Sequence, residues 1–312
     1  MASRRLLLWG AFLLLWAGLP LLASRHLVDL LVFAGLYSIA GLGVAFLLGQ
    51  CGIVNLAQSV FYGIGAYAVA WFCAHKGLPS PVGMAAGMAV SALVAVGVGW
   101  PILRLSGHFL ALATLALGII GQVLFLEWDW LTGGTLGIGG IPRIAPFGFA
   151  FDTPHRFYYL VWPLTAGLLW LHHNLLESRT GLALRAMRDS PEAAAVLGVD
   201  LHKLKVQMFV LSAMLGSFAG SLFAHYVTFV SVDSFSIDTA IRFLLLAVLG
   251  GVYTVWGPIL GALFITILPQ WLSRLGDIHA FVFAAALVAA VILLPEGFGG
   301  AIRNRWRART AK

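Results

Sequence analysis

Charge is scarce in this 312-residue sequence. Asp, Glu, Lys and Arg make up 10% of the residues, whereas a soluble domain carries about 25%. Hydrophobic residues make up 61% of the chain. Because such a chain has too few polar groups to cover a surface in water, we predict a single all-α polytopic membrane domain over residues 1–312.

Carboxylates are absent from the interiors of the apolar runs. All 12 Asp and Glu residues fall in loops or at the ends of predicted spans. A proton-coupled carrier usually needs an ionisable group near the membrane midplane, where the coupling ion binds and leaves. The chain therefore has no evident coupling group of its own, although sodium coupling through backbone carbonyls stays open.

Motifs for ATP hydrolysis and for metal chemistry are also missing. A phosphate-binding P-loop needs a Gly-Lys pair, and no lysine of this chain follows a glycine. The His-Glu-x-x-His pattern does not occur, and the adjacent His172 and His173 point to different sides of one helix. We therefore predict that the chain is not an enzyme and that it holds no metal and no cofactor.

Cysteine is nearly absent as well. Cys51 and Cys73 should lie near opposite ends of one span, roughly 33 Å apart at 1.5 Å per helical residue. Cysteines whose Cα atoms are more than about 7 Å apart cannot be bridged. We interpret both as small apolar residues.

Ten apolar runs are predicted to span the membrane. The first follows Arg4 and Arg5, and we expect it to be retained, because Leu21 stands where a small residue should precede a signal-peptide cleavage after Ala23. The predicted spans are Leu6–Leu22, Leu27–Gly49, Ile53–Phe72, Val82–Leu103, His108–Leu126, Phe157–Leu176, Val206–Val230, Ile237–Gly251, Trp256–Leu275 and Ala280–Leu294.

Basic residues predict the orientation of these spans. If the N-terminus is cytoplasmic, the inward segments, including the basic tail 299–312, hold 13 of the 19 Lys and Arg residues. Cytoplasmic loops of membrane proteins carry an excess of Lys and Arg. We therefore predict that both termini are cytoplasmic.

One long polar segment, residues 177–205, separates two of the apolar runs. Within it, Ser190 is typical of a helix N-cap, Pro191 of the first helical position and Glu192 of the positive end of the helix dipole. Gly198 can end the helix in the left-handed conformation. We predict a short helix that docks on another protein through a small apolar face of Ala193, Ala194 and Leu197.

Glycine and amide residues interrupt the third predicted span. Gly49–Gly52 should break or kink the helix, and Asn55, Gln58 and Ser59 follow. Non-helical backbone at membrane depth is tolerated only inside protein or beside a water-filled cavity. Two interpretations stay open: this span lines a translocation path, or its glycines merely let helices approach closely, as we expect for Gly83/Gly87, Gly216/Gly220 and Gly257/Gly261.

A family resemblance rests on several of these motifs. Glu192-Ala193-Ala194, three residues and then Gly198 resembles the EAA signature of ATP-binding-cassette importer permeases, whose loop docks on the ATPase subunit. Over most of residues 35–298 the chain is similar to the branched-chain amino acid permease family, specifically its LivM-type subunit. The similar stretches are Gly49–Tyr67, Gly107–Ala116, Thr132–Gly134 with Gly139–Pro142, Ser178–Gly198 continuing to His225-Tyr226, Leu249–Gly251 with Trp256–Pro258, and Pro295–Gly297.

The resemblance implies a location in the bacterial cytoplasmic membrane and a set of partners: a homologous LivH-type permease, two cytoplasmic ATP-binding subunits and a periplasmic substrate-binding protein, with no nucleic acid. Glu192 to Gly198, with Ser190 and Pro191 before them, would seat in the ATPase. The Gly-rich outer loop from Thr132 to Pro142, within residues 128–156, would face the binding protein. The residues implied near the path are Gln50, Asn55, Gln58, Ser59, Thr114 and Arg242.

Three positions depart from the family pattern. Gln58 stands where a histidine is expected, and Ile119 and Arg242 stand where the family often has an acid. The last two changes would make the path less favourable for an ammonium group. One interpretation is a substrate without a free amine, either a carboxylate or an amide. In the other, Arg242 pairs with Asp238, four residues earlier, and extends outward.

Two other functional classes stay open. A stand-alone ion-coupled secondary transporter would need a coupling-ion site, and a passive channel would conduct without ATPase partners. A membrane scaffold without a transport role would not need a broken third span.

Overall fold

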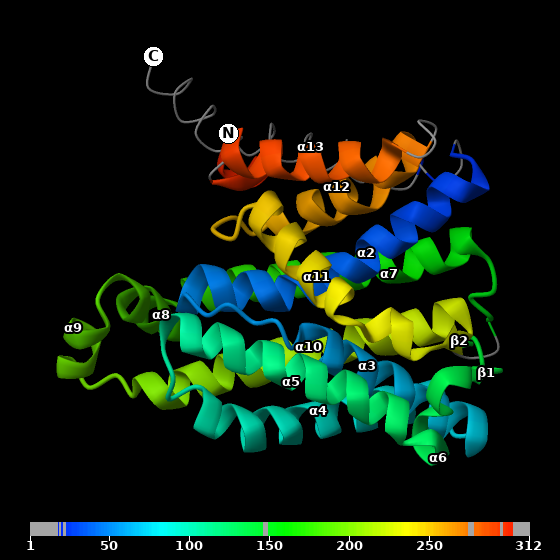
Figure 1. Cartoon of the computed structure of the whole chain (residues 1–312), viewed down its shortest axis with the longest axis horizontal. Helices are drawn as coiled ribbons and strands as arrows, with labels where there is room; N and C mark the ends of the chain where they lie inside the picture. Colours follow the sequence, from blue (N-terminus) through cyan, green and yellow to red (C-terminus); the bar gives the residue numbers. More distant parts are fainter. Residues whose placement is uncertain are drawn as a thin grey trace.

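A computed structural model describes residues 18, 20, 23–145, 149–273, 278–293 and 296–301. The prediction for the first span, Leu6–Leu22, and that for most of the basic tail lie outside the described residues. The described chain is largely helical, with most of its helices running along the long axis of the molecule (Figure 1). This arrangement supports the predicted all-α class.

The elements follow the order of the predicted spans. The long helices are α2 Arg25–Phe46, α4 Ser80–Ile102, α5 Gly107–Glu127, α7 Pro154–Glu177 and α10 Leu201–Val227. The shorter helices are α3 Gln58–Val69, α6 Asp129–Thr132, α8 Arg179–Asp189, α9 Pro191–Val196, α11 Ile237–Gly250, α12 Gly257–Leu272 and α13 His279–Leu293. Two π-helical turns extend α2 and α3, η1 Leu47–Cys51 and η2 Ala70–His75, and two 3₁₀ turns cover Gly134–Leu136 and Val232–Phe235.

Four of the described helical segments are long and apolar enough to cross a membrane: Arg25–Cys51, Ser80–Ile102, Gly107–Glu127 and Leu201–Val227. Gly257–Leu272 and Phe281–Ala290 are apolar but shorter. The chain is therefore a multi-pass membrane protein by composition and length of its helices, and the count of ten spans stays a prediction.

The helices differ in how far they are enclosed by the rest of the chain. In the most apolar stretch of α2, 83% of the residues are buried, against 28% in α4 and 33% in α5. Helix α10 packs against α2, α3 and α4. α2 and α10 thus form the centre of the bundle, whereas α4 and α5 lie at its periphery and turn much of their apolar surface outward.

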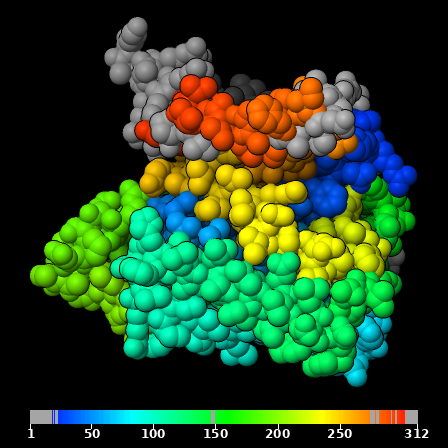
Figure 2. Space-filling model, viewed as in Figure 1, coloured from blue at the N-terminus to red at the C-terminus, as the bar shows by residue number. Residues whose placement is uncertain are grey.

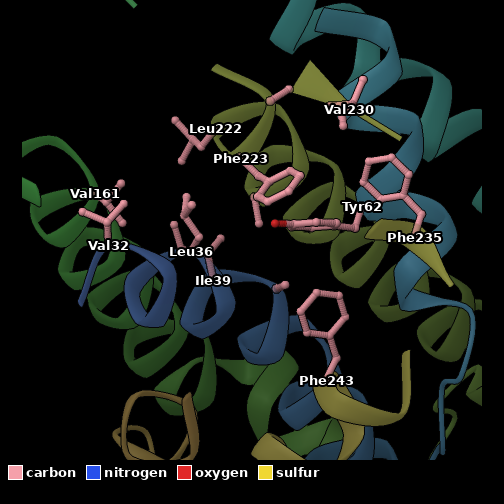
Figure 3. Close-up of a cluster of buried hydrophobic side chains, with 14 of the residues drawn as sticks. Val32, Leu36, Ile39, Tyr62, Val161, Leu222, Phe223, Val230, Phe235 and Phe243 are labelled. Atoms are coloured by element: carbon pink, nitrogen blue, oxygen red, sulfur yellow. The ribbon is translucent and has the colours of Figure 1, made fainter. Parts of the chain in front are cut away.

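Aromatic rings fill the core between the central helices. Figure 3 shows Tyr62 of α3 between Phe223 of α10 and Phe243 of α11, with ring centroids 5.4 Å and 5.2 Å away. Phe235, from the 3₁₀ turn before α11, closes the same cluster at 5.9 Å from Tyr62. Large buried rings of this kind supply much of the packing energy in a helical core.

Glycine allows α3 and α10 to come into backbone contact. A Cβ atom at Gly220 would overlap the carbonyl of Tyr62, and a Cβ atom at Gly65 would overlap the backbone of Ser217. Small residues at such crossings let transmembrane helices pack closely. The expectation for the glycines of α10 is therefore confirmed.

The two ends of the bundle differ. α8 and α9 project from one end, on the left in Figures 1 and 2. At the opposite end lie α6 and the antiparallel pair β1 (Ile138–Gly139) and β2 (Phe229–Val230). The ring of His225 also contacts the carbonyl of Pro142, at 2.6 Å from Nδ1. The Gly-rich loop is therefore held against the C-terminal end of α10.

Replacing Gly220 with alanine should destabilise the protein. The new methyl group meets backbone, which cannot move aside, and overpacking of this kind costs about 1–3 kcal/mol. Thermal unfolding in detergent would measure the change. Gly97→Ala on α4 is the matched control, because the space around Gly97 is open. Equal unfolding midpoints for the two variants would contradict the close crossing of α3 and α10.

Candidate functional site at the broken span

The polypeptide is not helical between η1 and α3. Gly52 takes the left-handed conformation, with φ 66°, at the end of η1, and helix resumes only at Gln58. The predicted break at Gly49–Gly52 is therefore confirmed, but the unwound part continues through Ala57. The predicted third span, Ile53–Phe72, consists of an unwound segment followed by a short helix that runs through η2 to His75.

Side chains supply hydrogen bonds to the unwound segment. The backbone N–H of Leu56 donates to Thr114 Oγ1 of α5 at 3.2 Å, and that of Ala57 donates to Asn55 Oδ1 at 3.0 Å. The N–H of Ile53 donates to the carbonyl of Leu47 at 3.1 Å. Unpaired backbone groups cost free energy in an apolar environment. These bonds therefore stabilise the unwound backbone within the bundle.

Gln58 connects three helices. Its Nε2 donates to the carbonyls of Ala40 at 3.0 Å and Ser212 at 3.1 Å. Its Oε1 accepts from Asn55 Nδ2 and from Ser212 Oγ, each at 3.1 Å. The side-chain amide thus makes all four hydrogen bonds that an amide can make, and joins α2, α3 and α10.

Most residues assigned to the path are enclosed by the chain itself. Asn55, Gln58 and Thr114 are completely buried, and their polar atoms bond to protein groups. Ser59 and Gln50 are also buried, and Ser59 Oγ has no partner within the described part of the chain. These residues are packed inside the protein around the broken span. Their contact with a substrate stays a prediction.

Arg242 differs from the other predicted path residues, because it is exposed. Among the described ion pairs, none joins Arg242 to Asp238, so the predicted pairing is not found. Ile119 of α5 is also exposed, at 44%. Helix α11, which carries Arg242, packs against α5, and both helices lie on the face shown in Figure 2.

Helix α9 begins and ends as the sequence predicts. The side chain of Ser190 accepts the N–H of Ala193 at 3.4 Å, Pro191 is the first helical residue, and Gly198 has φ 83°. These features place a short capped helix at the tip of the projecting end.

The predicted apolar face of α9 needs a correction. Ala194 is 1% exposed and turns toward the rest of the chain, where α9 packs on α8. Ala193 and Leu197 are exposed as predicted, Leu197 at 79%, and Val196, at 89%, belongs to the exposed face in place of Ala194. Spacing by three residues from Ala193 could have identified Val196, because residues three and four apart share one face of a helix.

A cavity of about 430 Å³ lies at the opposite end of the molecule. Its polar lining consists of His75, Asp129 and the backbone of the Gly-rich loop, and Trp130 lies beside them. The cavity lies between the end of η2, which supplies Ala74 and His75, and the loop of residues 128–156. It leaves the prediction that this loop faces a binding protein untested.

The histidine pair of α7 makes ordinary contacts. The ring of His172 packs edge-on against Phe46, with centroids 5.0 Å apart, and His173 Nε2 lies 3.3 Å from Glu177 Oε1. Among the described residues no group of three or more His, Cys, Asp or Glu side chains is placed to hold a metal ion.

These observations define a helical, multi-pass membrane protein with an unwound segment inside the bundle and a capped helix projecting from one end. Residues 26–294 match the family described as "Branched-chain amino acid transport system / permease component", and the chain belongs to this family.

Individual relatives agree with this assignment. The chain is 30% identical to the high-affinity branched-chain amino acid transport system permease protein LivM of Escherichia coli K12, over 92% of this chain and 73% of that protein. It is 23% identical to LivH of Salmonella typhimurium LT2, over 85% and 91% of the two chains. The xylose/arabinose import permease protein XylH of Sulfolobus acidocaldarius is 26% identical over 50% and 46%. No solved structure matches the chain.

Gln58→Leu should lower the stability of the protein. It would leave Asn55 Nδ2 and the hydroxyl of Ser212 buried without their acceptor, at about 1–3 kcal/mol for each group, and would remove the additional hydrogen bonds to the carbonyls of Ala40 and Ser212. Thermal unfolding in detergent would measure the loss. Gln207→Leu is the control, because Gln207 lies on α10 with an exposed side chain. If Gln58 instead lined an open path, its replacement would alter uptake and leave the unfolding midpoint unchanged.

Proposed function

We propose that this chain is the LivM-type permease subunit of an ATP-driven importer and forms half of the path for a branched-chain amino acid or a related small amino acid, organic acid or amide. The observation that carries the proposal is α9: a capped helix, ended by Gly198, that presents Val196 and Leu197 to the outside at one end of a membrane bundle. Such a helix suits insertion into a groove of a partner protein.

The driving force is expected from that partner. The chain contains no P-loop, and Asp29 and Asp238, which do lie on long or apolar helices, sit in or near their first turns. Without an ionisable carboxylate at mid-span there is no evident proton site. We therefore place ATP hydrolysis in two separate cytoplasmic subunits that bind α9.

The path would lie between this chain and a homologous LivH-type permease. Two observations support this arrangement: similarity to both LivM and LivH proteins, and the exposed apolar surface of α4 and α5. The pair α5–α11, with Ile119 and Arg242, would then contribute to the wall of the path, and the buried amides would hold that wall in shape.

In this mechanism, closure of the ATPases would displace α9 and rock the two permeases from an inward-open to an outward-open arrangement. A periplasmic binding protein would deliver the substrate at the opposite end, beside the Gly-rich loop. The orientation follows from the basic residues: α9 and both termini on the cytoplasmic side of a bacterial cytoplasmic membrane.

Leu197→Asp should prevent association with the ATP-binding subunits, because it places a charge in the apolar contact of α9. Co-purification of the tagged permease pair with its ATPases would measure this. Leu136→Asp is the matched control for this readout: Leu136 is 85% exposed and Leu197 79%, but Leu136 lies at the other end of the molecule. Retention of the ATPases by the Leu197 variant would contradict docking through α9.

The substrate class can be tested on the partner binding protein. We expect leucine, isoleucine or valine to raise its thermal unfolding midpoint, because a ligand that binds only the folded state stabilises it. The deaminated analogue of leucine is the comparison. A larger shift with this analogue than with leucine would instead support a substrate without a free amine.

A further inference from the structure

Arg188 of α8 contacts two segments of the membrane bundle and the neighbouring Asp189. It lies in the last turn of α8, two residues before Ser190. Its NH1 group donates to the carbonyl of Gly49 at 2.9 Å. Its guanidinium carbon lies 4.7 Å from the centre of the Tyr253 ring, and its NH2 group is 3.4 Å from Asp189 Oδ1.

The carbonyl of Gly49 lies in the last helical turn before the break. Carbonyls at the end of a helix have no intrahelical donor and must find one elsewhere. Arg188 provides that donor from a residue 139 positions away. Hydrogen bonds from a charged donor are stronger than neutral ones, so this bond connects α8 firmly to the start of the unwound segment.

Tyr253 brings a third segment to the same point. It belongs to the loop between α11 and α12, and the neighbouring Val252 touches Gly49 closely: a Cβ atom at Gly49 would overlap the carbonyl of Val252. The end of α8, the end of η1 and the α11–α12 loop therefore meet around Gly49. Arg188 contacts both of the other two segments.

Ser190 connects α8 directly to α9. It is the C-cap residue of α8 and the N-cap residue of α9, so no flexible linker separates the two helices. A displacement of α9 would therefore act on the end of α8 that carries Arg188.

We propose that Arg188 is a positioning residue that transmits the displacement of α9 to the unwound segment Gly52–Ala57 and to the α11–α12 loop. The inference rests on the proposed function and deepens it, because it names the residue through which ATP hydrolysis outside the membrane changes the shape of the path. The planar guanidinium suits this role: it donates to a carbonyl and stacks on a ring at the same time, which an ammonium group does less well.

The test uses the complete transporter in lipid vesicles and compares Arg188→Gln with the unaltered protein. Three quantities are measured: the ATPase subunits that co-purify, the rate of ATP hydrolysis, and the solute taken up per ATP hydrolysed. We expect the first two to stay near their original values and the third to fall several-fold, because ATPase docking through α9 persists while its displacement no longer reaches Gly49.

Two further variants separate transmission from a general loss of structure. Arg188→Lys keeps the positive charge and a hydrogen-bond donor group but loses the planar guanidinium. It should recover part of the uptake per ATP. Tyr253→Leu leaves the bond to Gly49 and removes the ring, and should reduce uptake per ATP less than Arg188→Gln. Arg104→Gln is the control, because Arg104 is an exposed arginine after α4 and the described structure gives its side chain no hydrogen bond or ion pair.

The outcomes distinguish this inference from the proposed function. If the unaltered permeases bind no ATPase and show no ATP-dependent uptake, the proposed function fails and the inference falls with it. If the unaltered permeases bind the ATPases and show ATP-dependent uptake, but Arg188→Gln keeps the original uptake per ATP, only the inference is overturned. Loss of the ATPase subunits from Arg188→Gln, with Leu197 intact, would also overturn it, since Arg188 would then serve docking.

Discussion

Every backbone polar group at membrane depth must find a partner inside the protein, and the unwound segment Gly52–Ala57 makes this requirement acute. Thr114 and Asn55 each accept one backbone N–H of the segment, and Gln58 fastens its end to α2 and α10. These few bonds connect the segment and the start of α3 to α5, α2 and α10. Close helix crossings at Gly65 and Gly220 then bring the partners within reach.

The same constraint explains how an unwound segment could be useful. A helix interior has its hydrogen bonds fixed along its own axis, whereas Gly52–Ala57 depends on Thr114 of α5 and on Asn55, which is held in turn by Gln58. A shift of those residues therefore changes the support of the segment directly. The contact of Arg188 with Gly49 lies where this segment begins, and the capped helix α9 lies two residues beyond Arg188.

Local features of the structure could be read from the sequence. The sequence signals for three features lie on residues that are adjacent or one helical turn apart. These features are the break at Gly49–Gly52, the caps of α9 and the glycines at close helix crossings. The exposed face of α9 is predictable too: Ala193 and Leu197 are correctly assigned, and the helical spacing favours Val196 over Ala194 as the third residue of that face. Alanine at a helix–helix contact and alanine on an open face look the same in a sequence.

Long-range features could not be predicted in this way. The amides of the third span suggested a path lining, but two partners of Gln58 are groups of Ser212, 154 positions later, and they turn that side chain into a link between helices. Arg188 looked like one of several bases in a polar loop, because Gly49 and Tyr253 are remote in the sequence. The pairing of Arg242 with Asp238 had the right spacing, yet it is not found among the described ion pairs.

The central claim is that this chain moves a solute with energy supplied through α9 by another subunit. The most direct measurement is solute accumulation in vesicles that contain this chain alone, the permease pair, or the permease pair with its ATPases and binding protein, each with and without ATP. The account predicts accumulation only in the complete set supplied with ATP on the α9 side. Accumulation by this chain alone would contradict it and would indicate an ion-coupled transporter, while equilibration without ATP would indicate a passive channel.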